Sequence, residues 1–430
     1  MTVYRRTPAL QAYSGVARLL GPVASAWLDR RAAGGKEDRD RLSERRGIAS
    51  LPRPGGALVW LHAASVGESL VALSLADGLL AARSDLSILI TSGTLTSANL
   101  IAQRAPGAVL HQFVPVDHPG WAARFIAHWR PEAGVFLESE LWPNLIAEAA
   151  RAGVPLALAN ARMNDASIRS WGRFSGAFRA LASSFDWIGA ADARTAQGLE
   201  RLTGKPPALV ANLKLEAAQP DPDPDALAQV RAALGARPVF TAASTHAGEE
   251  AILARAHAGI LKTRPDALMI LAPRHPARTD EAGEALRAHG LAFARRSDGA
   301  APDASTPVWL ADTLGEMGLW YALSPVAVIG GSFIDAIGGH NPVEATRAGS
   351  AVVTGPFTAS FADVYAAYRA HDAVLTAATA DEIAGAVLAI WDGRGPAAEA
   401  GKRAIASLPG GALARTSAAI LSLLSREARS

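Results

Sequence analysis

Two successive series of short apolar segments, each segment followed by a stretch with helical spacing, constrain the fold of this chain more than any other feature. Such alternation predicts parallel sheets with helices on both faces. A Pro- and Asp-rich stretch at 220–224 separates the two series and predicts a linker. Because 430 residues are too many for one hydrophobic core, we expect an α/β fold with two doubly wound, Rossmann-like domains.

The apolar segments define the expected strands. In the first domain they are 57–63, 86–91, 108–115, 133–137, 154–159, 187–191 and 208–213. In the second domain they are 239–243, 267–272, 291–294, 308–311, 326–329 and 351–353, and closing helices are expected at 380–391 and 412–425. Ligands of such sheets bind outside the carboxyl ends of the strands, so the informative residues should follow strands.

The composition excludes several classes of protein. With 42 Lys and Arg against 40 Asp and Glu, the net charge is only +2, which does not favour nucleic acid as a partner. The absence of Cys rules out disulfides, thiolate catalysis and Cys-ligated metal, and it fits a reducing compartment such as the cytoplasm.

The N-terminal segment 8–27 is mildly apolar and admits two interpretations. Arg18 and Pro22 interrupt it, so it does not predict a membrane-spanning helix. It could form a helix on a membrane surface, with a basic stretch after it. It could equally form an ordinary core helix followed by a solvated charged loop, and composition favours neither.

The first expected strand ends in a turn that carries Ser65, Gly67 and Glu68. A carboxylate at a helix start near the sheet edge is suited to a site, and the helix dipole is expected to lower its pKa. The spacing of Ser65 and Glu68 also matches a capping box, which is a structural role. His62, at the end of the strand, is more often a packed histidine than a catalytic one.

Two carboxylates, Glu138 and Glu140, directly follow the fourth expected strand. Because a parallel strand is buried on both faces, these carboxylates are hard to explain as solvated surface. A pair of acids across a glycosidic bond is one interpretation, and a metal site is a weaker one. Arg162 and Lys214 follow later strands and could simply pair with these carboxylates.

The expected strand ends of the second domain predict a nucleotide or nucleotide-sugar pocket. The turn at 243–250 should present hydroxyls and free backbone donors to a phosphate, Arg274 is suited to bidentate phosphate contact, and Asn341 should cap a helix with Pro342 at its first position. The candidate residues at these strand ends are Ser244, Thr245, His246, Pro273, Arg274, His275, Leu314, Gly315, Glu316, Gly330, Gly331, His340, Asn341, Pro342, Val343 and Glu344.

Motifs over nearly the whole chain resemble the 3-deoxy-D-manno-octulosonic acid (Kdo) transferases of lipopolysaccharide synthesis, which have the GT-B fold. The matching segments are Glu44-Arg45, 65–68, 138–145, 160–162 with Arg169-Ser170, 212–214, 244–250, 273–276, 312–316, 330–332 and 339–344. The resemblance implies inverting transfer of Kdo from CMP-Kdo to the lipid A precursor, lipid IVA, at the cytoplasmic face of the bacterial inner membrane. It implies no cofactor and no metal.

By position, the resemblance makes Glu68 the general base and makes Glu138 and Lys214 stabilisers of the transition state. The CMP site would comprise Pro273, Arg274, Leu314, Gly315, Glu316, Asn341, Pro342, Val343 and Glu344. The expected organisation is an N-terminal membrane-associated segment at 1–50, an acceptor-binding domain at 51–218, a linker at 219–226, a CMP-Kdo-binding domain at 227–405 that faces the first across a central cleft, and a closing helix at 406–430.

Because the acceptor implied by the resemblance is a membrane lipid, the membrane-surface interpretation of the N-terminal segment is favoured over the core-helix interpretation. One alternative function remains, namely another GT-B transferase or an epimerase that uses a UDP-sugar. A preference for UDP over CMP would favour that alternative.

Overall fold

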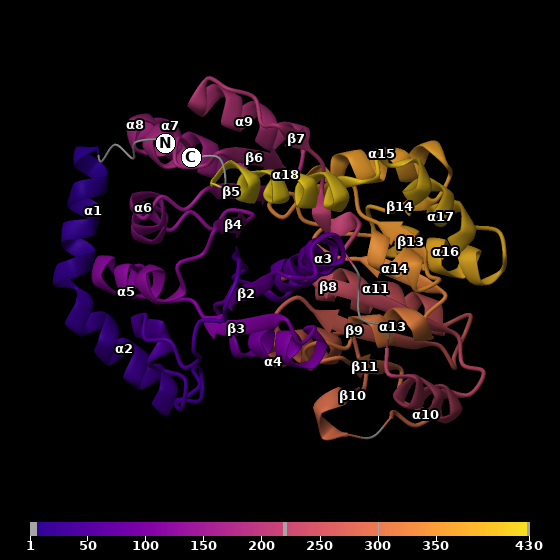
Figure 1. The fold of residues 1–430 in the computed structure, drawn as a ribbon. Helices are drawn as coiled ribbons and strands as arrows, with labels where there is room; N and C mark the ends of the chain where they lie inside the picture. Colours follow the sequence, from indigo (N-terminus) through magenta and orange to yellow (C-terminus); the bar gives the residue numbers. More distant parts are fainter. Residues whose placement is uncertain (1–6, 218–221, 300, 428–430) are drawn as a thin grey trace. The chain divides into compact units, whose positions relative to one another are not determined.

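The chain forms two units, each built around its own sheet (Figure 1). The structure is a computed structural model that describes residues 7–217, 222–299 and 301–427. Contacts assign Met1–Ala218 and Gly410–Ser430 to the first unit and Gln219–Pro409 to the second.

The sheet of the first unit has seven parallel strands in the order β3-β2-β1-β4-β5-β6-β7. The strands are β1 Leu58–His62, β2 Ser87–Ser92, β3 Val109–Phe113, β4 Ala133–Leu137, β5 Leu156–Ala161, β6 Trp187–Ala190 and β7 Leu209–Val210. Along β1, Leu58 and Trp60 face one hydrophobic core, whereas Val59 and Leu61 face another. Both faces of the strand are therefore buried, which explains its continuous apolar sequence.

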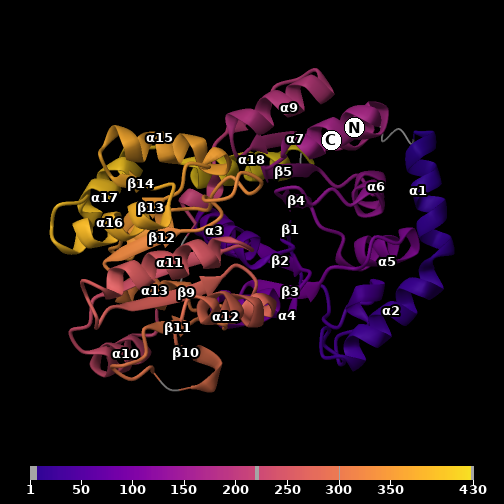
Figure 2. The same ribbon diagram turned by 180° about the vertical axis from the view of Figure 1, so that it is seen from behind.

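Helices cover both faces of this sheet. They are α1 Pro8–Leu19, α2 Gly21–Ala33, α3 Val66–Ala82, α4 Leu95–Arg104, α5 Pro119–Trp129, α6 Pro143–Arg151, α7 Asp165–Arg173, α8 Ser175–Ala182, α9 Ala193–Thr203 and α18 Ala412–Glu427. Helices α1 and α2 lie at the edge of the unit, where α1 packs against α5 and α6 (Figure 2).

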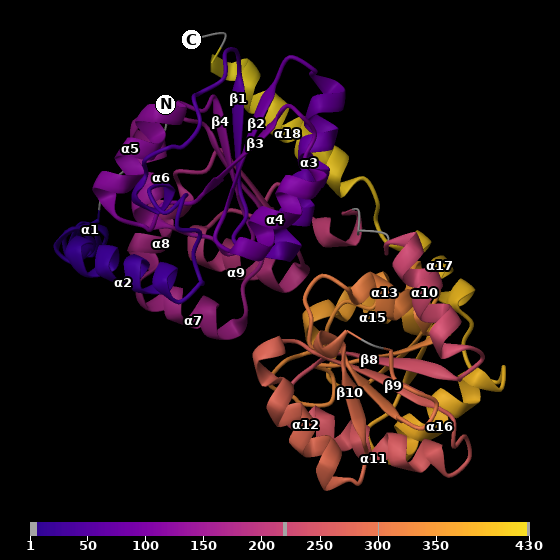
Figure 3. The same cartoon turned by 90° about the horizontal axis from the view of Figure 1, so that it is seen from below.

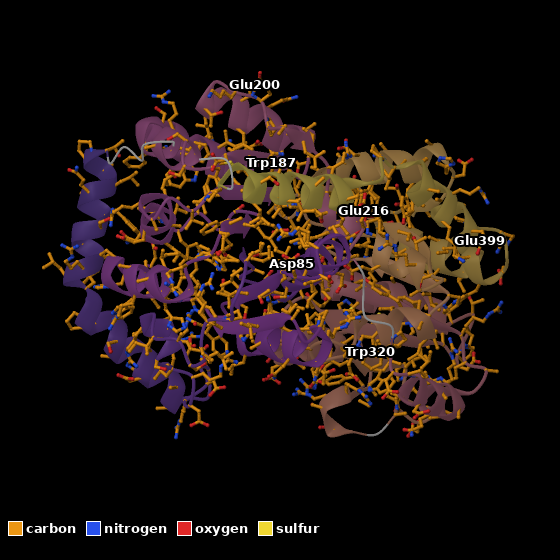
Figure 4. All side chains as sticks on the ribbon, in the orientation of Figure 1. Asp85, Trp187, Glu200, Glu216, Trp320 and Glu399 are labelled. Carbon is orange, nitrogen blue, oxygen red and sulfur yellow. The ribbon has the colours of Figure 1, made fainter. Side chains whose placement is uncertain are left out.

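The C-terminal helix α18 belongs to the first unit, although the chain has passed through the second unit before reaching it. It packs against α3, β4 and β5 (Figure 3). Glu216, labelled in Figure 4, accepts hydrogen bonds from the backbone N–H groups of Ala412 (2.8 Å) and Leu413 (2.9 Å). These are donors of the first turn of α18, so Glu216 caps the helix.

The second sheet also has seven parallel strands, in the order β10-β11-β9-β8-β12-β13-β14. They are β8 Val239–Thr245, β9 Leu268–Pro273, β10 Phe293–Arg295, β11 Val308–Leu310, β12 Val326–Ile329, β13 Ala351–Thr354 and β14 Val374–Thr376. The helices of this unit are α10 Pro224–Leu234, α11 Glu249–Leu261, α12 Thr279–Ala288, α13 Met317–Leu323, α14 Val343–Arg347, α15 Ala362–Ala370, α16 Ala380–Trp391 and α17 Ala398–Ser407.

The expected α/β fold with two doubly wound sheets is confirmed, with corrections at particular elements. The segment 208–213 pairs only at Leu209–Val210, and β14 was not expected. The linker predicted at 219–226 is too long, because α10 begins at Pro224 with Asp223 as its N-cap. Proline tolerates the first position of a helix, where no N–H is needed. Residues 218–221 lie outside the described residues.

Within the described residues, one stretch meets the length and composition expected of a membrane-spanning helix, Ala398–Ser425. It is not one helix, because α17 ends at Ser407 and α18 begins at Ala412. Pro409, Gly410 and Gly411 separate them. Since Ile420 and Leu423 of α18 are buried in the first unit, the apolar character of α18 is explained by the core.

Candidate active site

The carboxyl ends of β1, β4 and β5 meet at one edge of the first sheet, and they bring Glu68, Glu138 and Glu140 together. Glu68 lies in the first turn of α3, directly after β1. Its Oε2 accepts from Ala64 N at 2.8 Å and its Oε1 accepts from Ser65 Oγ at 2.7 Å, while Ser65 caps the helix. The predicted capping role of this pair is therefore confirmed, with the bond from Glu68 going to the residue before the N-cap.

The environment of Glu68 raises its pKa. Burial is the main cause, since the residue is only 6% exposed, and the negative charges of Glu138 and Glu140 act in the same direction against the hydrogen bonds from Ser65 and Ala64. The expectation of a lowered pKa was wrong, because desolvation and two like charges outweigh a helix terminus here. A carboxylate with a raised pKa is a stronger base once it is ionised.

Lys214 reaches this cluster from the loop after β7. Its Nζ lies 2.5 Å from Glu138 Oε1, which confirms the ion pair suggested by the sequence. A Cβ added to Gly67 would lie 3.4 Å from Lys214 Cε, so the lysine side chain passes over the start of α3 beside Glu68. Absence of a side chain at Gly67 leaves room for this approach.

Glu140 and His62 lie next to these groups. Burial, with a smaller effect of Glu138, raises the pKa of Glu140, whose Oε2 accepts from Trp142 Nε1 at 2.5 Å. His62 is fully buried, its Nδ1 is 3.0 Å from Thr91 Oγ1, and burial lowers its pKa to about 3. His62 is thus a packed histidine, as the sequence analysis favoured, and its low pKa keeps it neutral.

A pocket of about 130 Å³ adjoins Glu138 in the first unit. Its lining residues are Glu138, Ser139, Leu141, Leu158, Ala161, Met163, Ser167, Trp171, Phe178 and Leu199. Ser139 at its edge donates to the backbone oxygen of Arg162, which ties the loop after β4 to the end of β5.

In the second unit, the candidate CMP residues follow β9, β11 and β12, whose carboxyl ends lie at one edge of the sheet with that of β8. Arg274 directly follows β9 and is exposed. Its side chain makes no ion pair with residues 7–217, 222–299 or 301–427. Glu316, by contrast, is held by Arg296 at 2.8 Å just before α13, after the exposed Leu314 and Gly315.

Two phosphate-binding expectations need correction. The turn at 243–250 presents fewer donors than expected, because buried Glu249 accepts from the backbone N–H group of His246 (2.9 Å), and it also accepts from those of Gly331 (2.8 Å) and Phe333 (3.0 Å) after β12. The helix after His340 begins at Val343, with Pro342 as N-cap and Asn341 Oδ1 accepting from Val343 N at 3.0 Å. With only five residues, α14 supplies little dipole to offset a phosphate charge.

Comparison with known proteins places this arrangement in a family. The family described as "3-Deoxy-D-manno-octulosonic-acid transferase (kdotransferase)" matches residues 40–217. The 3-deoxy-D-manno-octulosonic acid transferase of Bordetella pertussis is 37% identical over 84% of this chain and 88% of its own length. A probable mitochondrial one of Arabidopsis thaliana is 36% identical over 78% of this chain and 77% of its own.

The chain belongs to the Kdo transferase family. It is thus a glycosyltransferase of the GT-B fold, as its motifs indicated. A solved structure described as a putative UDP-N-acetylglucosamine 2-epimerase from Listeria monocytogenes shares this fold, with a TM-score of 0.60 over 86% of this chain and 96% of that one. At 13% identity, this likeness shows the fold alone.

Asn160 of this Kdo transferase site was part of a matching sequence motif, but no role was predicted for it. Asn160, in β5, donates to Glu138 Oε1 at 3.3 Å and accepts from Leu213 N at 2.9 Å. It thereby joins Glu138 to the loop that carries Lys214. Both Asn160 (φ 56°) and Glu138 (φ 57°) have left-handed backbones, which are uncommon outside glycine and concentrate at functional sites.

Proposed function

We propose that this Kdo transferase transfers Kdo, with inversion, from CMP-Kdo to the lipid A precursor, lipid IVA. The observation that carries the proposal is the buried carboxylate of Glu68 beside the Glu138–Lys214 ion pair, at the ligand-binding edge of a sheet in a member of this family. No cofactor or metal enters the proposed reaction.

In this reaction Glu68 accepts the proton of an acceptor hydroxyl as the hydroxyl oxygen bonds to the anomeric carbon. The bond from that carbon to the phosphate oxygen breaks, and CMP leaves with the electron pair. Each Glu68 oxygen accepts one hydrogen bond from the protein and keeps a lone pair for this proton. In this proposal Glu138, whose carboxylate pairs with Lys214, stabilises positive charge on the sugar.

The donor is assigned to the second unit. Because the backbone N–H groups of His246 and Gly331 donate to Glu249 and α14 is short, Arg274 is the main group that would stabilise the negative charge developing on CMP. A guanidinium without a carboxylate partner suits a phosphate. Asn341 and Glu344 would contact the nucleoside, as the family motif suggests.

The proposal is tested by binding and by transfer. We expect calorimetry to show binding of CMP and at least tenfold weaker binding of UDP, since one tenfold step is about 1.4 kcal/mol. We also expect transfer of Kdo to a tetraacylated lipid A precursor. A clear preference for UDP would contradict the proposal and favour a UDP-sugar enzyme.

The same proposal places the enzyme at the cytoplasmic face of the inner membrane, bound through an N-terminal apolar face. This face comprises Val16, Leu19, Leu20, Val23 and Trp27, which are 48–81% exposed. The other side of the two helices is buried through Leu10 and Leu28. Exposed apolar side chains on a helix with Arg18 and Arg30 nearby suit an anionic lipid surface.

Replacing Leu19, Leu20 and Val23 with serine is expected to lower the fraction of enzyme that sediments with phosphatidylglycerol vesicles several-fold, because about 0.8 kcal/mol is lost for each buried methylene removed. Binding of CMP should not change. Deleting the whole segment is a poorer test, because it also uncovers the contacts of Leu10 and Leu28. Full sedimentation of the triple variant would show that the apolar face is not the anchor.

A further inference from the structure

Three histidines gather at the carboxyl edge of the second sheet. His246 follows β8, His275 follows β9, and His340 precedes α14. The Nε2 atoms of His246 and His340 are 2.8 Å apart, and their rings are stacked with centroids 5.0 Å apart. The ring of His275 stands perpendicular to that of His246, at 6.4 Å.

The backbone is built to bring the two stacked rings together. Gly331 has a φ of +67°, and a Cβ there would lie 2.8 Å from His340 Cδ2. Any other residue would push the ring away. The carbonyl of His340 accepts from the hydroxyl of buried Tyr365 at 3.0 Å, which fixes the other side of the loop.

Positive charge faces the two imidazoles from the segment that follows β9. Arg274, Arg278 and His275 face His246, and Arg274 and His275 face His340. The two nearby carboxylates already have partners. Glu249 accepts hydrogen bonds from three backbone N–H groups, and Glu250 pairs with Arg278 at 2.9 Å. Arg274 is left as a cation without a carboxylate partner among the described residues.

Both imidazoles are consequently held neutral. Burial, together with the neighbouring His246, Arg274 and His275, lowers the pKa of His340 to about 4. Burial also lowers the pKa of His246, although Glu249 acts in the opposite direction. An anion placed among these groups would reverse the balance and raise both pKa values, because opposite charge favours the protonated imidazole.

We propose that His246 and His340, with Arg274, bind an anionic oxygen group of the donor and take up one proton when they do so. The inference rests on the proposed function, because it takes the donor to be CMP-Kdo. The anionic group is either the phosphate or the carboxylate of the sugar acid. In the free protein the ring N–H of one imidazole donates to the ring nitrogen of the other. Protonation of the accepting ring gives it an additional N–H, which it can donate to the anion.

Isothermal titration calorimetry of the full chain tests this, with CMP and CMP-Kdo at pH 7 in two non-phosphate buffers of different ionisation enthalpy. The difference in apparent binding enthalpy counts the protons taken up. We expect uptake approaching one proton, and a Kd that rises up to about tenfold for each pH unit over the range of uptake. Uptake with CMP itself assigns the phosphate, whereas uptake with CMP-Kdo alone assigns the carboxylate.

His340→Gln and His246→Gln should each abolish the proton uptake and weaken binding of the same ligand about tenfold. His289→Gln, at an exposed histidine in the same unit, should leave both unchanged. Binding of CMP-Kdo without proton uptake, or uptake that persists in both variants, overturns this inference alone. Failure of the unsubstituted protein to bind CMP-Kdo overturns the proposed function instead.

Discussion

Glu68→Gln is expected to lower kcat for transfer of Kdo about 10³-fold, because the amide cannot accept the hydroxyl proton. Binding of CMP should be unchanged, since the donor is assigned to the other unit. The unsubstituted enzyme should lose activity as the pH falls through the Glu68 pKa, which burial raises above 4.5. This acid limb should therefore lie above the pH of an ordinary carboxylate, and a pH profile of kcat/KM measures it.

A second capping box provides the matched control. Thr379 caps α16 and Glu382 accepts from Ala378 N at 2.6 Å, which repeats the helix cap of Ser65 and the backbone contact of Glu68 with Ala64. Glu382→Gln should cost a similar amount of stability and leave kcat unchanged. If Glu68→Gln retains near wild-type activity, or if both variants lose activity equally, Glu68 acts only as a cap and is not the base.

Glu249→Ala is expected to lower the free energy of unfolding by about 3–5 kcal/mol, because it leaves the backbone N–H groups of His246, Gly331 and Phe333 without their acceptor in a buried place. Those groups belong to the loops after β8 and β12. Urea unfolding followed by circular dichroism measures the effect. Affinity for CMP should fall as well, since the same loops carry the histidine pair.

Glu399→Ala is the control for this variant. Glu399, labelled in Figure 4, also lies in the first turn of a helix, but it is exposed, and within the described part of the chain its ion pair is with Lys402, at 2.6 Å. Its loss should change the unfolding free energy by less than about 0.5 kcal/mol. Equal effects of the two substitutions would show that Glu249 does not hold the loops together.

The central strands could be predicted from the sequence because they are buried on both faces. The runs at 133–137 and 326–329 match β4 and β12 residue for residue. The edge strands could not be predicted as well. β7 has two paired residues and β14 has three, and both are partly exposed, so their sequences need not be continuously apolar.

For the candidate site, the sequence predicted which residues lie together better than it predicted their burial and pKa shifts. Residues just after strands were expected to converge, and Glu68, Glu138 and Lys214 do lie together. The predicted direction of the Glu68 pKa shift was wrong because the shift depends mainly on burial by the folded unit, and further on Glu138 and Glu140, which are distant in sequence. Glu249 was missed for the same kind of reason, since two of its three donors lie more than 80 residues away.

The return of α18 to the first unit has a consequence for synthesis of the chain. Ala412, Ile420 and Leu423 complete a core whose other buried residues lie before 218, so translation must proceed through the whole second unit before that core can close. The N-terminal half therefore emerges from the ribosome with an apolar surface uncovered, whereas the second unit is contiguous and can fold first. The order of folding would then be the reverse of the order of synthesis.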